Sequence, residues 1–407
     1  MSKSGKKTSG KTLSAIIVGG GIGGLSAALA LARQGIACTV LERADSLGEV
    51  GAGIQLSPNA THVLHVLGLS DALNRVAFRP DAVEARVWRS GRMINRAPLG
   101  SFAEAQFGAP YFHIHRADLV SVLAEAVAAE PLVSLRLGQA GIACAHDGTA
   151  AVTTGDGQAL SADLLIGADG IHSLVREMLF GAQEPRFTGN VAWRGVIPAA
   201  LVADAAIAPV AGLWMGPGAH FVHYFLRRGE LLNFVGIVET ADWHDESWSA
   251  RGSKAQLLRD FGHWHPAVRS IVAAAPVDGC FRWALFDRAP LPNWSKGNAS
   301  LLGDACHPTL PFMAQGACMA IEDAAVLAGC LAGAEAAQVP QRLLRYEALR
   351  KDRTAAIQAA SRRNAKMYHL RPPLSWLRNR AMQKGHGLSA QMRDLYGYDA
   401  LVAPQTT

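Results

Sequence analysis

Residues 19–24 read GGGIGG, a G-x-G-x-x-G pattern that stands between the apolar run at 15–18 and an alanine- and leucine-rich segment. The segment at 22–34 has the length and composition of a buried helix, and 37–41 is a second apolar run. Short apolar runs on either side of a glycine turn and a helix predict a βαβ unit with a buried parallel sheet. The chain therefore opens an α/β domain of the Rossmann type.

The glycines of this pattern suit a phosphate-binding turn. Gly19 allows the tight turn, Gly21 lets the backbone approach a pyrophosphate, and Gly24 lets the helix pack on the strand. We assign Gly23 to the same cofactor-binding turn, where the helix N-terminus supplies N–H donors and a positive dipole end. Glu42 ends the second strand 18 residues after Gly24, where a carboxylate can hold ribose hydroxyls. This acid favours NAD or FAD over NADP, and a glycine turn without a ligand is the alternative.

Two further acids follow predicted strands. Asp169 stands in GADG at 167–170, and Asp304 stands in LGDACHP at 302–308. A simple dehydrogenase has no use for an acid 280 residues beyond its phosphate turn. FAD can use one, because its ribityl chain and isoalloxazine extend far from the adenosine. Either acid could instead cap a helix.

Charge is concentrated at the two ends of the chain. The net charge is +6, but residues 1–11 contain four lysines, and residues 342–384 carry 12 Lys or Arg against Glu347 and Asp352. Subtracting +4 and +10 from +6 leaves −8 for the rest. A nucleic-acid-binding protein would need a basic body, so we expect no nucleic-acid partner. We interpret 1–11 as a disordered basic tail and the late basic segment as a solvated or self-associating helix, the latter giving a homodimer.

Composition and spacing argue against a secreted, membrane-spanning, disulfide-rich or metal-binding protein. Residues 12–32 lack charge, as a signal peptide or membrane helix would, but five glycines within 19–24 favour a strand, a turn and a helix. Six cysteines without a C-x-x-C pair exclude a disulfide scaffold and a cysteine-built zinc site. His263 and His265 have no third ligand at useful spacing, so we expect no metal. We predict a cytoplasmic protein with no membrane partner.

The sequence pattern of the α/β domain is interrupted near residue 190 and resumes after residue 292. Aromatic-rich runs separated by turn residues predict an antiparallel sheet inserted into the α/β domain. These runs are 82–88, 191–198, 212–215, 220–226, 231–239 and 281–286. Apolar spacing and composition predict helices over 116–129, 314–331 and 340–367. The predicted organisation is an FAD-binding domain of 12–80, 110–188 and 288–345, a substrate domain of 81–109 and 189–287, and a C-terminal helical segment of 346–407.

Three separated motifs resemble those of the FAD-dependent aromatic hydroxylases, single-component flavoprotein monooxygenases of the p-hydroxybenzoate hydroxylase type. They are GGGIGG with LER at 41–43, IGADGIHSLVR at 166–176, and LLGDACHPTLPFMAQGACMAIEDA at 301–324. The resemblance covers about residues 13–366. Within the family, EVGAGIQLSPNA at 49–60, VAWRGVIPA at 191–199 and AHFVHY at 219–224 are similar to one branch. That branch holds 3-hydroxybenzoate 6-hydroxylase, salicylate hydroxylase and 6-hydroxynicotinate 3-monooxygenase.

The resemblance implies FAD as the bound cofactor. It places Glu42 and Arg43 on the adenosine side and Arg116 on the phosphate and ribityl region. Asp304 would hydrogen-bond the ribityl chain, and Asp169 is assigned to the cofactor with it. NADH or NADPH would visit transiently as co-substrate, which agrees with the lack of a second G-x-G-x-x-G.

The resemblance also implies the flavin environment and the reaction. Gln55 would lie near the flavin. The backbone of Gly316 and Ala317 would face the pyrimidine edge at a helix N-terminus, where negative charge on reduced flavin is stabilised. The implied reaction is hydroxylation of a small aromatic acid by O₂ through a flavin C4a-hydroperoxide. The alternatives are a same-fold reductase or dehydrogenase that does not use O₂, and a non-enzymatic membrane-surface binder.

His220 and Tyr224 are the candidate catalytic residues. On a strand over 220–226 they share one face, whereas His223 points away. An imidazole can take the proton of a phenolic hydroxyl and so make the ring electron-rich, and the resemblance implicates a histidine at this position. Tyr224 would hydrogen-bond the substrate.

Trp193, Pro311 and Phe312 are expected to line the substrate pocket. The resembling hydroxybenzoate and hydroxynicotinate enzymes carry a Gln near Pro311 or a His near Phe312. This chain is more apolar there, so neither activity can be transferred whole.

Overall fold

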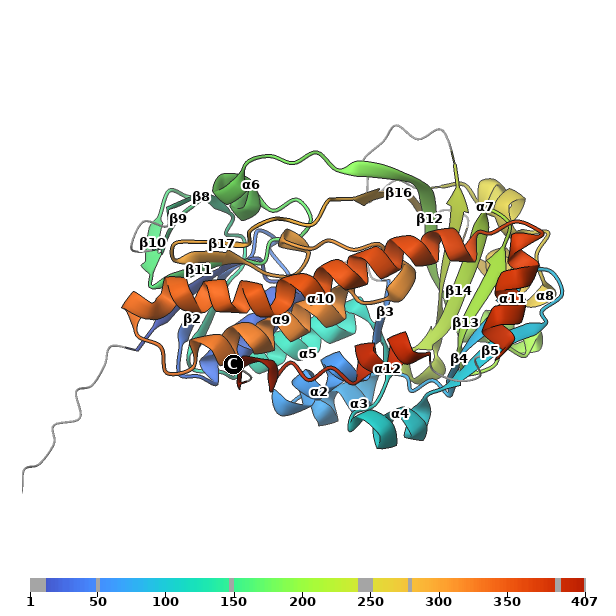
Figure 1. The fold of residues 1–407 in the computed structure, drawn as a ribbon, viewed down its shortest axis with the longest axis horizontal. Coiled ribbons are helices and arrows are strands. Elements are labelled where there is room, and N and C mark those ends of the chain that lie inside the picture. The colour runs from blue at the N-terminus through green and yellow to red at the C-terminus, as the bar shows by residue number, and fades with distance from the viewer. Residues whose placement is uncertain are drawn as a thin grey trace, which may run out of the picture.

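The computed structural model describes residues 12–48, 52–145, 150–240, 252–276, 280–384 and 389–405. Figure 1 shows two large sheets toward opposite ends of an elongated molecule, with the long helix α10 (Val339–Tyr368) running from one toward the other. The predicted tail at 1–11 lies outside the described residues. No helix within the described ranges is both long and apolar enough to cross a membrane.

A six-stranded sheet carries the glycine motif. Its order is β17-β18-β11-β1-β2-β7, with β17 antiparallel at one edge and the other strands parallel. The strands are β1 (Ser14–Val18), β2 (Ala37–Leu41), β7 (Val133–Arg136), β11 (Leu164–Gly167), β17 (Ser295–Lys296) and β18 (Ala299–Leu301). Helices α1 (Ile22–Ala32), α5 (Arg116–Ala128) and α9 (Gly316–Leu331) bury their apolar residues in the core of this unit. The predicted Rossmann-like unit is confirmed.

A seven-stranded sheet forms the other end, in the order β16-β12-β15-β14-β13-β4-β5. Its strands are β4 (Ala82–Val87), β5 (Met93–Pro98), β12 (Arg186–Pro198), β13 (Ala211–Gly216), β14 (Ala219–Leu226), β15 (Leu231–Glu239) and β16 (Phe281–Asp287). The inserted sheet is confirmed, but β13 pairs with β4 in parallel rather than antiparallel. Edge strand β5 was not predicted because Asn95 and Arg96 break its apolar pattern. Helices α7 (Lys254–Phe261) and α8 (Pro266–Ala274) cover one face.

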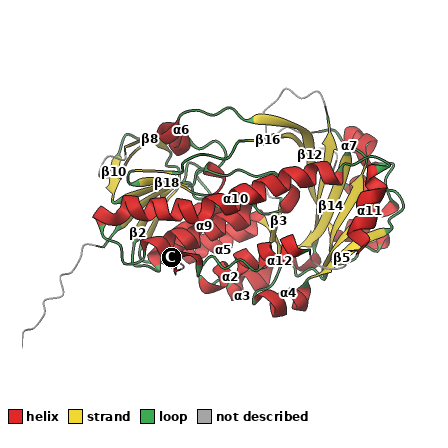
Figure 2. Cartoon of the chain, in the orientation of Figure 1, coloured by secondary structure: helices red, strands yellow, loops and turns green. Residues whose placement is uncertain are grey.

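Smaller elements fill the space between the two sheets and around them. In Figure 2, β3 (Gly53–Leu56) lies near the middle of the molecule, and it pairs with the short strand β6 (Phe112–His115). The other helices are α2 (Pro58–Val66), α3 (Ser70–Val76), α4 (Gly100–Phe107), α6 (Leu174–Phe180), α11 (Leu374–Lys384) and α12 (Ala390–Tyr396). A small sheet is formed by β8 (Gly141–Ala145), β9 (Ala150–Thr154) and β10 (Ala159–Ala162).

Two arginines of the late basic segment pair with buried acids of α9. Arg350 of α10 is fully buried, with Nη2 2.6 Å from Glu322 Oε2 and Nε 2.7 Å from Asp323 Oδ1. Arg353 Nη2 lies 2.7 Å from Glu322 Oε1. The interpretation of this segment as a solvated helix is therefore wrong for Arg350 and Arg353, whereas Arg363 and Lys366 of α10 are exposed. The two arginines face acids of α9, which a count of charges along the sequence does not reveal.

The buried carboxylates of this cluster are held ionised. Burial alone would raise the pKa of Asp323, but His307 and Arg350 outweigh it and lower the pKa to about 2. The pKa of Glu322 is lowered in the same way, because Arg350 and Arg353 outweigh burial. The pKa of Arg350 is raised well above its ordinary value, since Glu322 and Asp323 outweigh burial in the opposite sense. The cluster is thus a set of mutually dependent charges.

Replacing Arg350 by Met should destabilise the protein by about 3–5 kcal/mol, because two buried carboxylates lose their shared partner. Urea unfolding at pH 7 measures the change. The matched control is Arg363→Met, at an exposed position of the same helix, which should shift the free energy of unfolding by less than about 0.5 kcal/mol. In the wild type, the contribution of Asp323 is present above its ordinary pKa of 3.8 and is lost as pH falls through about 2. Equal stability of the two variants would contradict this account.

Candidate active site

The predicted cofactor residues meet at one edge of the parallel sheet. Gly19 follows β1, Glu42 follows β2, Asp169 lies two residues beyond β11, and Asp304 lies three residues beyond β18. β1 pairs with β2 and β11, and β11 pairs with β18. The carboxyl ends of parallel strands share one edge, so this pairing brings together residues that are far apart in the sequence.

The glycine turn combines tightly packed positions with one open position. Gly19 has a φ of +110°, and a Cβ added there would lie 2.4 Å from a backbone oxygen just beyond β11. A Cβ at Gly24 would lie 1.9 Å from the Gly19 oxygen, and one at Gly23 would lie 2.7 Å from a leucine side chain. A Cβ at Gly21 would meet nothing within 4 Å. The backbone at Gly21 therefore borders space that a pyrophosphate can enter.

Glu42 is tied to this turn. Its Oε2 accepts a hydrogen bond of 2.7 Å from the Gly20 amide, and its Oε1 accepts one of 2.9 Å from the Ala44 amide. The carboxylate is half-buried, and Arg43 beside it is exposed. Each carboxylate oxygen can accept a further hydrogen bond, which suits ribose hydroxyls.

Asp169 has its partners within the protein. Its Oδ1 accepts a hydrogen bond of 2.5 Å from the Ser173 hydroxyl, and its Oδ2 accepts from the amides of Leu174 at 2.7 Å and Val175 at 3.2 Å. These groups begin α6, so the carboxylate caps that helix. The helix-cap alternative accounts for Asp169 without a ligand.

Asp304 lies in the short turn η3 (Gly303–Ala305), beside the start of α9. A Cβ added at Gly316 would lie 3.9 Å from Asp304 Oδ1. The Asp304 side chain is accessible to solvent, although protein atoms surround its carboxylate. This enclosure raises the pKa of Asp304, and the nearby charges of His307 and Arg116 oppose the rise. Gly316 and Ala317 are half-buried at the first turn of α9, where helix amides lack intrahelical partners. An accessible carboxylate beside backbone donors fits the ribityl chain and pyrimidine edge of FAD.

Strand β3 brings Gln55 to the inserted sheet. The Tyr111 hydroxyl donates a hydrogen bond of 2.7 Å to Gln55 Oε1, and the Gly53 amide donates one of 2.8 Å to Asn233 Oδ1 on β15. A Cβ added at Gly53 would lie 2.5 Å from the Tyr224 ring. β3 therefore packs directly on the sheet face that carries Tyr224.

His220 and Tyr224 share the sheet face that looks toward β3 and α10, as the alternation predicts. Both side chains are buried. The His220 ring centroid lies 5.3 Å from those of Phe312 and Tyr368, and Phe312 belongs to the turn η4 (Pro311–Met313). His223 packs on the opposite face, toward Trp214. Pro311 and Phe312 therefore lie on the His220 side of the sheet.

The prediction that Trp193 lines the pocket is wrong. Trp193 is fully buried on the opposite face, packed with Phe221, and its Nε1 donates a hydrogen bond of 2.8 Å to Asp260 Oδ2 of α7. Alternation along β12 gives the inward position to Arg194, which aligns across β15 with Val222 of β14. The motif identifies the right strand, but a single strand does not reveal which of its faces is inward.

Two inward residues were missed by sequence reasoning. The Arg194 guanidinium lies 5.3 Å from the Trp283 ring centroid, and burial lowers its pKa while Tyr224 opposes the shift. Among the residues that the structure describes, no carboxylate pairs with Arg194. His369 Nε2 lies 2.8 Å from His220 Nδ1. Alternation could have revealed Arg194, but no local signal marks His369.

Cys306, His307 and Asp323 lie close enough together to suggest metal ligands. The Asp323 carboxylate is already engaged by His307 Nε2 at 2.5 Å, by the Gly303 amide at 3.0 Å and by Arg350. Burial raises the pKa of the Cys306 thiol well above its ordinary value, which disfavours the thiolate that binds metals. We assign no metal to this cluster.

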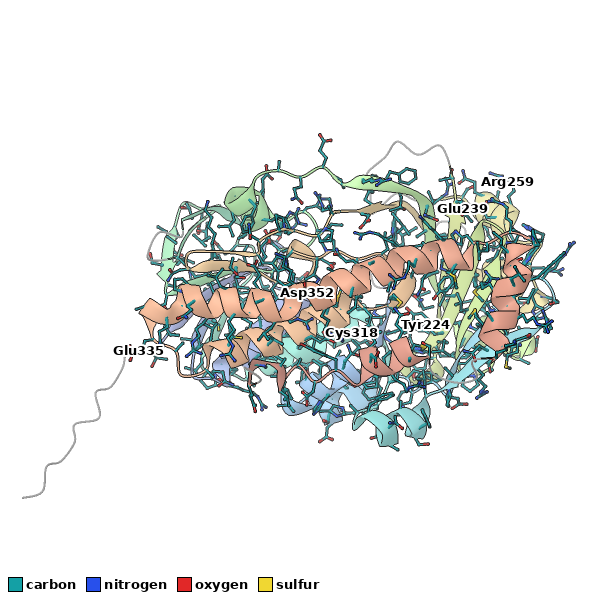
Figure 3. The ribbon with its side chains drawn as sticks, viewed as in Figure 1. Tyr224, Glu239, Arg259, Cys318, Glu335 and Asp352 are labelled. Atoms are coloured by element: carbon teal, nitrogen blue, oxygen red, sulfur yellow. The ribbon has the colours of Figure 1, made fainter. Side chains whose placement is uncertain are left out.

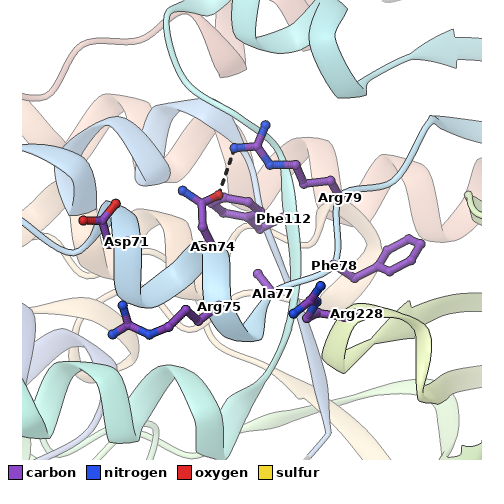
Figure 4. A pocket seen from close by; sticks show the side chains of 8 residues that line it. All are labelled: Asp71, Asn74, Arg75, Ala77, Phe78, Arg79, Phe112 and Arg228. Atoms are coloured by element: carbon purple, nitrogen blue, oxygen red, sulfur yellow. Dashed lines mark hydrogen bonds between the residues drawn. The ribbon is translucent and has the colours of Figure 1, made fainter.

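A surface pocket of about 620 Å³ lies beside α3 (Figure 4). It is lined by Asp71, Asn74, Arg75, Ala77, Phe78, Arg79, Phe112 and Arg228. Arg79 reaches across to Asn74, whose Oδ1 accepts a hydrogen bond of 2.9 Å. None of these lining residues belongs to the predicted site, which is built at the strand ends instead.

Comparisons with known proteins find relatives that align with most of the chain. The family described as FAD binding domain matches residues 12–361. A 3-amino-4-hydroxybenzoate 2-monooxygenase of Streptomyces platensis is 39% identical over 387 residues, covering 94% of this chain and 96% of that protein. A 3-hydroxybenzoate 6-hydroxylase of Klebsiella oxytoca is 38% identical over 361 residues, covering 88% and 89%. The solved structure of a salicylate hydroxylase substrate complex matches with a TM-score of 0.82 at 25% identity, covering 97% of each chain.

Replacing Gly21 by Ala should weaken FAD binding about ten-fold or more without unfolding the apoprotein, because the new methyl group enters only the ligand space. The matched variant Gly24→Ala should instead lower the thermal stability of the apoprotein, because its Cβ collides with the Gly19 oxygen. Flavin fluorescence titration and thermal unfolding measure the two effects. Wild-type FAD affinity in Gly21→Ala would remove the pyrophosphate from this turn.

Proposed function

The chain belongs to the family that carries this FAD-binding domain and is an FAD-dependent aromatic monooxygenase, and from this premise we propose that it hydroxylates a small aromatic or heteroaromatic acid that bears a hydroxyl group. The resemblance inferred from the sequence motifs is confirmed. Salicylate, 3-hydroxybenzoate and 6-hydroxynicotinate are candidate substrates, and the amino-hydroxybenzoate in the name of the Streptomyces relative is a further one. The observation that carries the proposal is the sheet face shared by His220, Tyr224 and Arg194.

FAD would lie along the carboxyl edge of the parallel sheet. The backbone of Gly21 would hold the pyrophosphate, Glu42 and Arg43 the adenosine, Arg116 the phosphate and ribityl region, and Asp304 the ribityl hydroxyls. The remaining contacts that we propose are those of Gln55, Gly316 and Ala317 with the flavin. When bound, FAD passes electrons from NADH or NADPH to O₂ and supplies the electrophilic oxygen.

His220 would act as the base toward the substrate hydroxyl. Its pKa lies well below the ordinary value because burial disfavours the imidazolium, and His369 adds to this effect. The ring is therefore neutral at pH 7 and can accept a proton, which leaves the substrate ring electron-rich. Burial raises the pKa of Tyr224 to about 12 against the charge of Arg194, so the hydroxyl stays protonated and can donate to a substrate oxygen.

Arg194 would bind the substrate carboxylate. It is a half-buried cation without a carboxylate partner in the described part of the chain, and an anionic substrate would supply the missing charge. The neighbours of the Arg194 guanidinium are the Trp283 ring and the side chain of Tyr224. Pro311 and Phe312 would offer apolar surface to the aromatic ring.

The alternatives have less support. The relatives are named as monooxygenases or hydroxylases, not as reductases that avoid O₂ or as membrane-surface binders. We further propose a cytoplasmic location and a homodimer. For the homodimer, α11 offers the exposed apolar side chains of Leu374, Trp376 and Leu377.

Purified holoenzyme should be yellow and should oxidise NADH or NADPH faster when 3-amino-4-hydroxybenzoate, 3-hydroxybenzoate, salicylate or 6-hydroxynicotinate is added in air. Product mass should rise by one oxygen atom, or reflect the exchange of a carboxylate for a hydroxyl. Without O₂, the flavin should be reduced but no product should form. A colourless protein that cannot be reconstituted with FAD would end this proposal, and product formed without O₂ would favour the reductase.

Replacing Arg194 by Gln should raise KM for the acid substrate about ten- to hundred-fold, because a charged hydrogen-bond partner of the carboxylate is lost. The matching amide, which has no negative charge, should lose far less. Steady-state NAD(P)H oxidation with the acid and its amide gives both values. Equal losses for acid and amide would show that Arg194 does not recognise the carboxylate.

A further inference from the structure

His220 is connected to a second buried histidine. His220 Nδ1 and His369 Nε2 lie 2.8 Å apart, and the two ring centroids are 5.0 Å apart. Both imidazoles are buried. His369 follows the last residue of α10, so the helix that Arg350 anchors also positions this ring.

The contacts continue from His369 to the surface. His369 Nδ1 lies 3.3 Å from Glu239 Oε1, and the Glu239 side chain at the end of β15 is 41% exposed. Arg371 Nη2 donates a hydrogen bond of 3.2 Å to the other carboxylate oxygen. The Gly218 amide donates to the His369 oxygen at 2.9 Å, and the Glu239 amide donates to the Gly218 oxygen at 2.8 Å, which holds these segments together. In Figure 3, Glu239 lies at the outer end of the sheet and Tyr224 lies toward the middle of the molecule.

We propose that His220, His369 and Glu239 form a path along which the proton of the substrate hydroxyl leaves the active site for bulk water. The proposal rests on the proposed function, in which His220 takes that proton. His369 and Glu239 are positioning residues that act through His220.

The contacts determine which nitrogen carries each proton. An ionised carboxylate can only accept, so Glu239 requires a proton on His369 Nδ1. A neutral His369 then has a lone pair on Nε2, which accepts from the Nδ1–H of His220. His220 Nε2 is thereby left without a proton, and it is the nitrogen that can accept one from the substrate.

Each transfer along the path breaks one bond to hydrogen and forms another. The phenolic O–H bond breaks as a bond forms from that proton to His220 Nε2. The proton on His220 Nδ1 passes to His369 Nε2, and the proton on His369 Nδ1 passes to Glu239, which releases it to water. When the oxygen regains its proton in the product, the transfers run in reverse from Glu239 and restore the starting tautomers. No oxidant or further reactant is needed.

The surroundings of the rings favour transfer over storage of the proton. Burial lowers the pKa of His369 to about 4, with Glu239 opposing the shift and Arg371 and Arg378 adding to it. Two aromatic side chains, from η4 and α10, flank His220. Neither imidazole holds a positive charge well in this setting, so the proton moves on to the exposed carboxylate.

The test follows proton release when a phenolic acid binds to oxidised holoenzyme without O₂. Stopped-flow mixing with 3-amino-4-hydroxybenzoate, or with 3-hydroxybenzoate if only that acid is hydroxylated by the wild type, uses weak buffer and a pH-indicator dye. Phenolate absorbance in the ultraviolet reports deprotonation separately. His369→Phe keeps an aromatic ring but cannot relay a proton, and it should slow both signals about ten-fold or more with FAD content unchanged.

Further variants separate a relay from packing. Glu239→Gln should slow proton release, whereas Glu230→Gln, an exposed acid just before the opposite end of β15, should not. Imidazole added to His369→Ala should restore the rate, because a small base can occupy the vacated space. Rescue of His369→Ala by imidazole distinguishes a proton relay from packing even if His369→Phe folds poorly.

Wild-type rates in both His369 variants would overturn the path, and so would slow rates in His369→Ala that imidazole does not raise. The second result would give His369 a packing role only. Failure of the proposed function looks different, since the wild-type holoenzyme would then show no substrate-stimulated NAD(P)H oxidation. His220→Ala, which should keep its FAD but lose hydroxylation about a hundred-fold, tests the base separately from the path.

Discussion

The fold and the site both depend on one guanidinium group buried between two carboxylates. Arg350 joins α10 to α9 through Glu322 and Asp323, and none of the three side chains is exposed. α9 begins at Gly316, beside Asp304 at the carboxyl edge of the parallel sheet, and α10 is followed by His369, which contacts His220. One ion cluster therefore fixes two segments that contribute to different parts of the proposed site.

Such a cluster favours one arrangement over its competitors. Removing a charge from water costs several kcal/mol, so packings of α10 on α9 that separate the charges are disfavoured. Asp323 also accepts a hydrogen bond from the Gly303 amide, in the turn that carries Asp304. Glu322 accepts one of 2.6 Å from Asn59 at the start of α2. The packing of α10 on α9 and the geometry of the turn that carries Asp304 thus depend on the same charges.

The sequence predicted correctly those elements that are specified by residues close together in the chain. The glycine turn, its flanking strands and the extents of α9 and α10 follow from short-range patterns, and alternation placed His220 and Tyr224 on one face. Reasoning failed where the outcome depends on distant partners. Trp193 was assigned inward because its strand does not reveal its covered face, and Arg350 was counted as solvated because its acids belong to another helix. His369 lies 149 residues from the ring that it contacts.

The order of strands in the parallel sheet also constrains how the chain matures. β1 is made first, yet its partner β11 begins at residue 164 and β18 ends at residue 301 of 407. Pairing between such distant segments forms slowly, because a large loop must be closed before the contact stabilises it. During synthesis β1 and β2 are therefore made long before β11 and β18, the strands that complete this side of the sheet. The carboxyl edge where Gly19, Glu42 and Asp304 meet is therefore complete only after β18 has been made and has paired with β11.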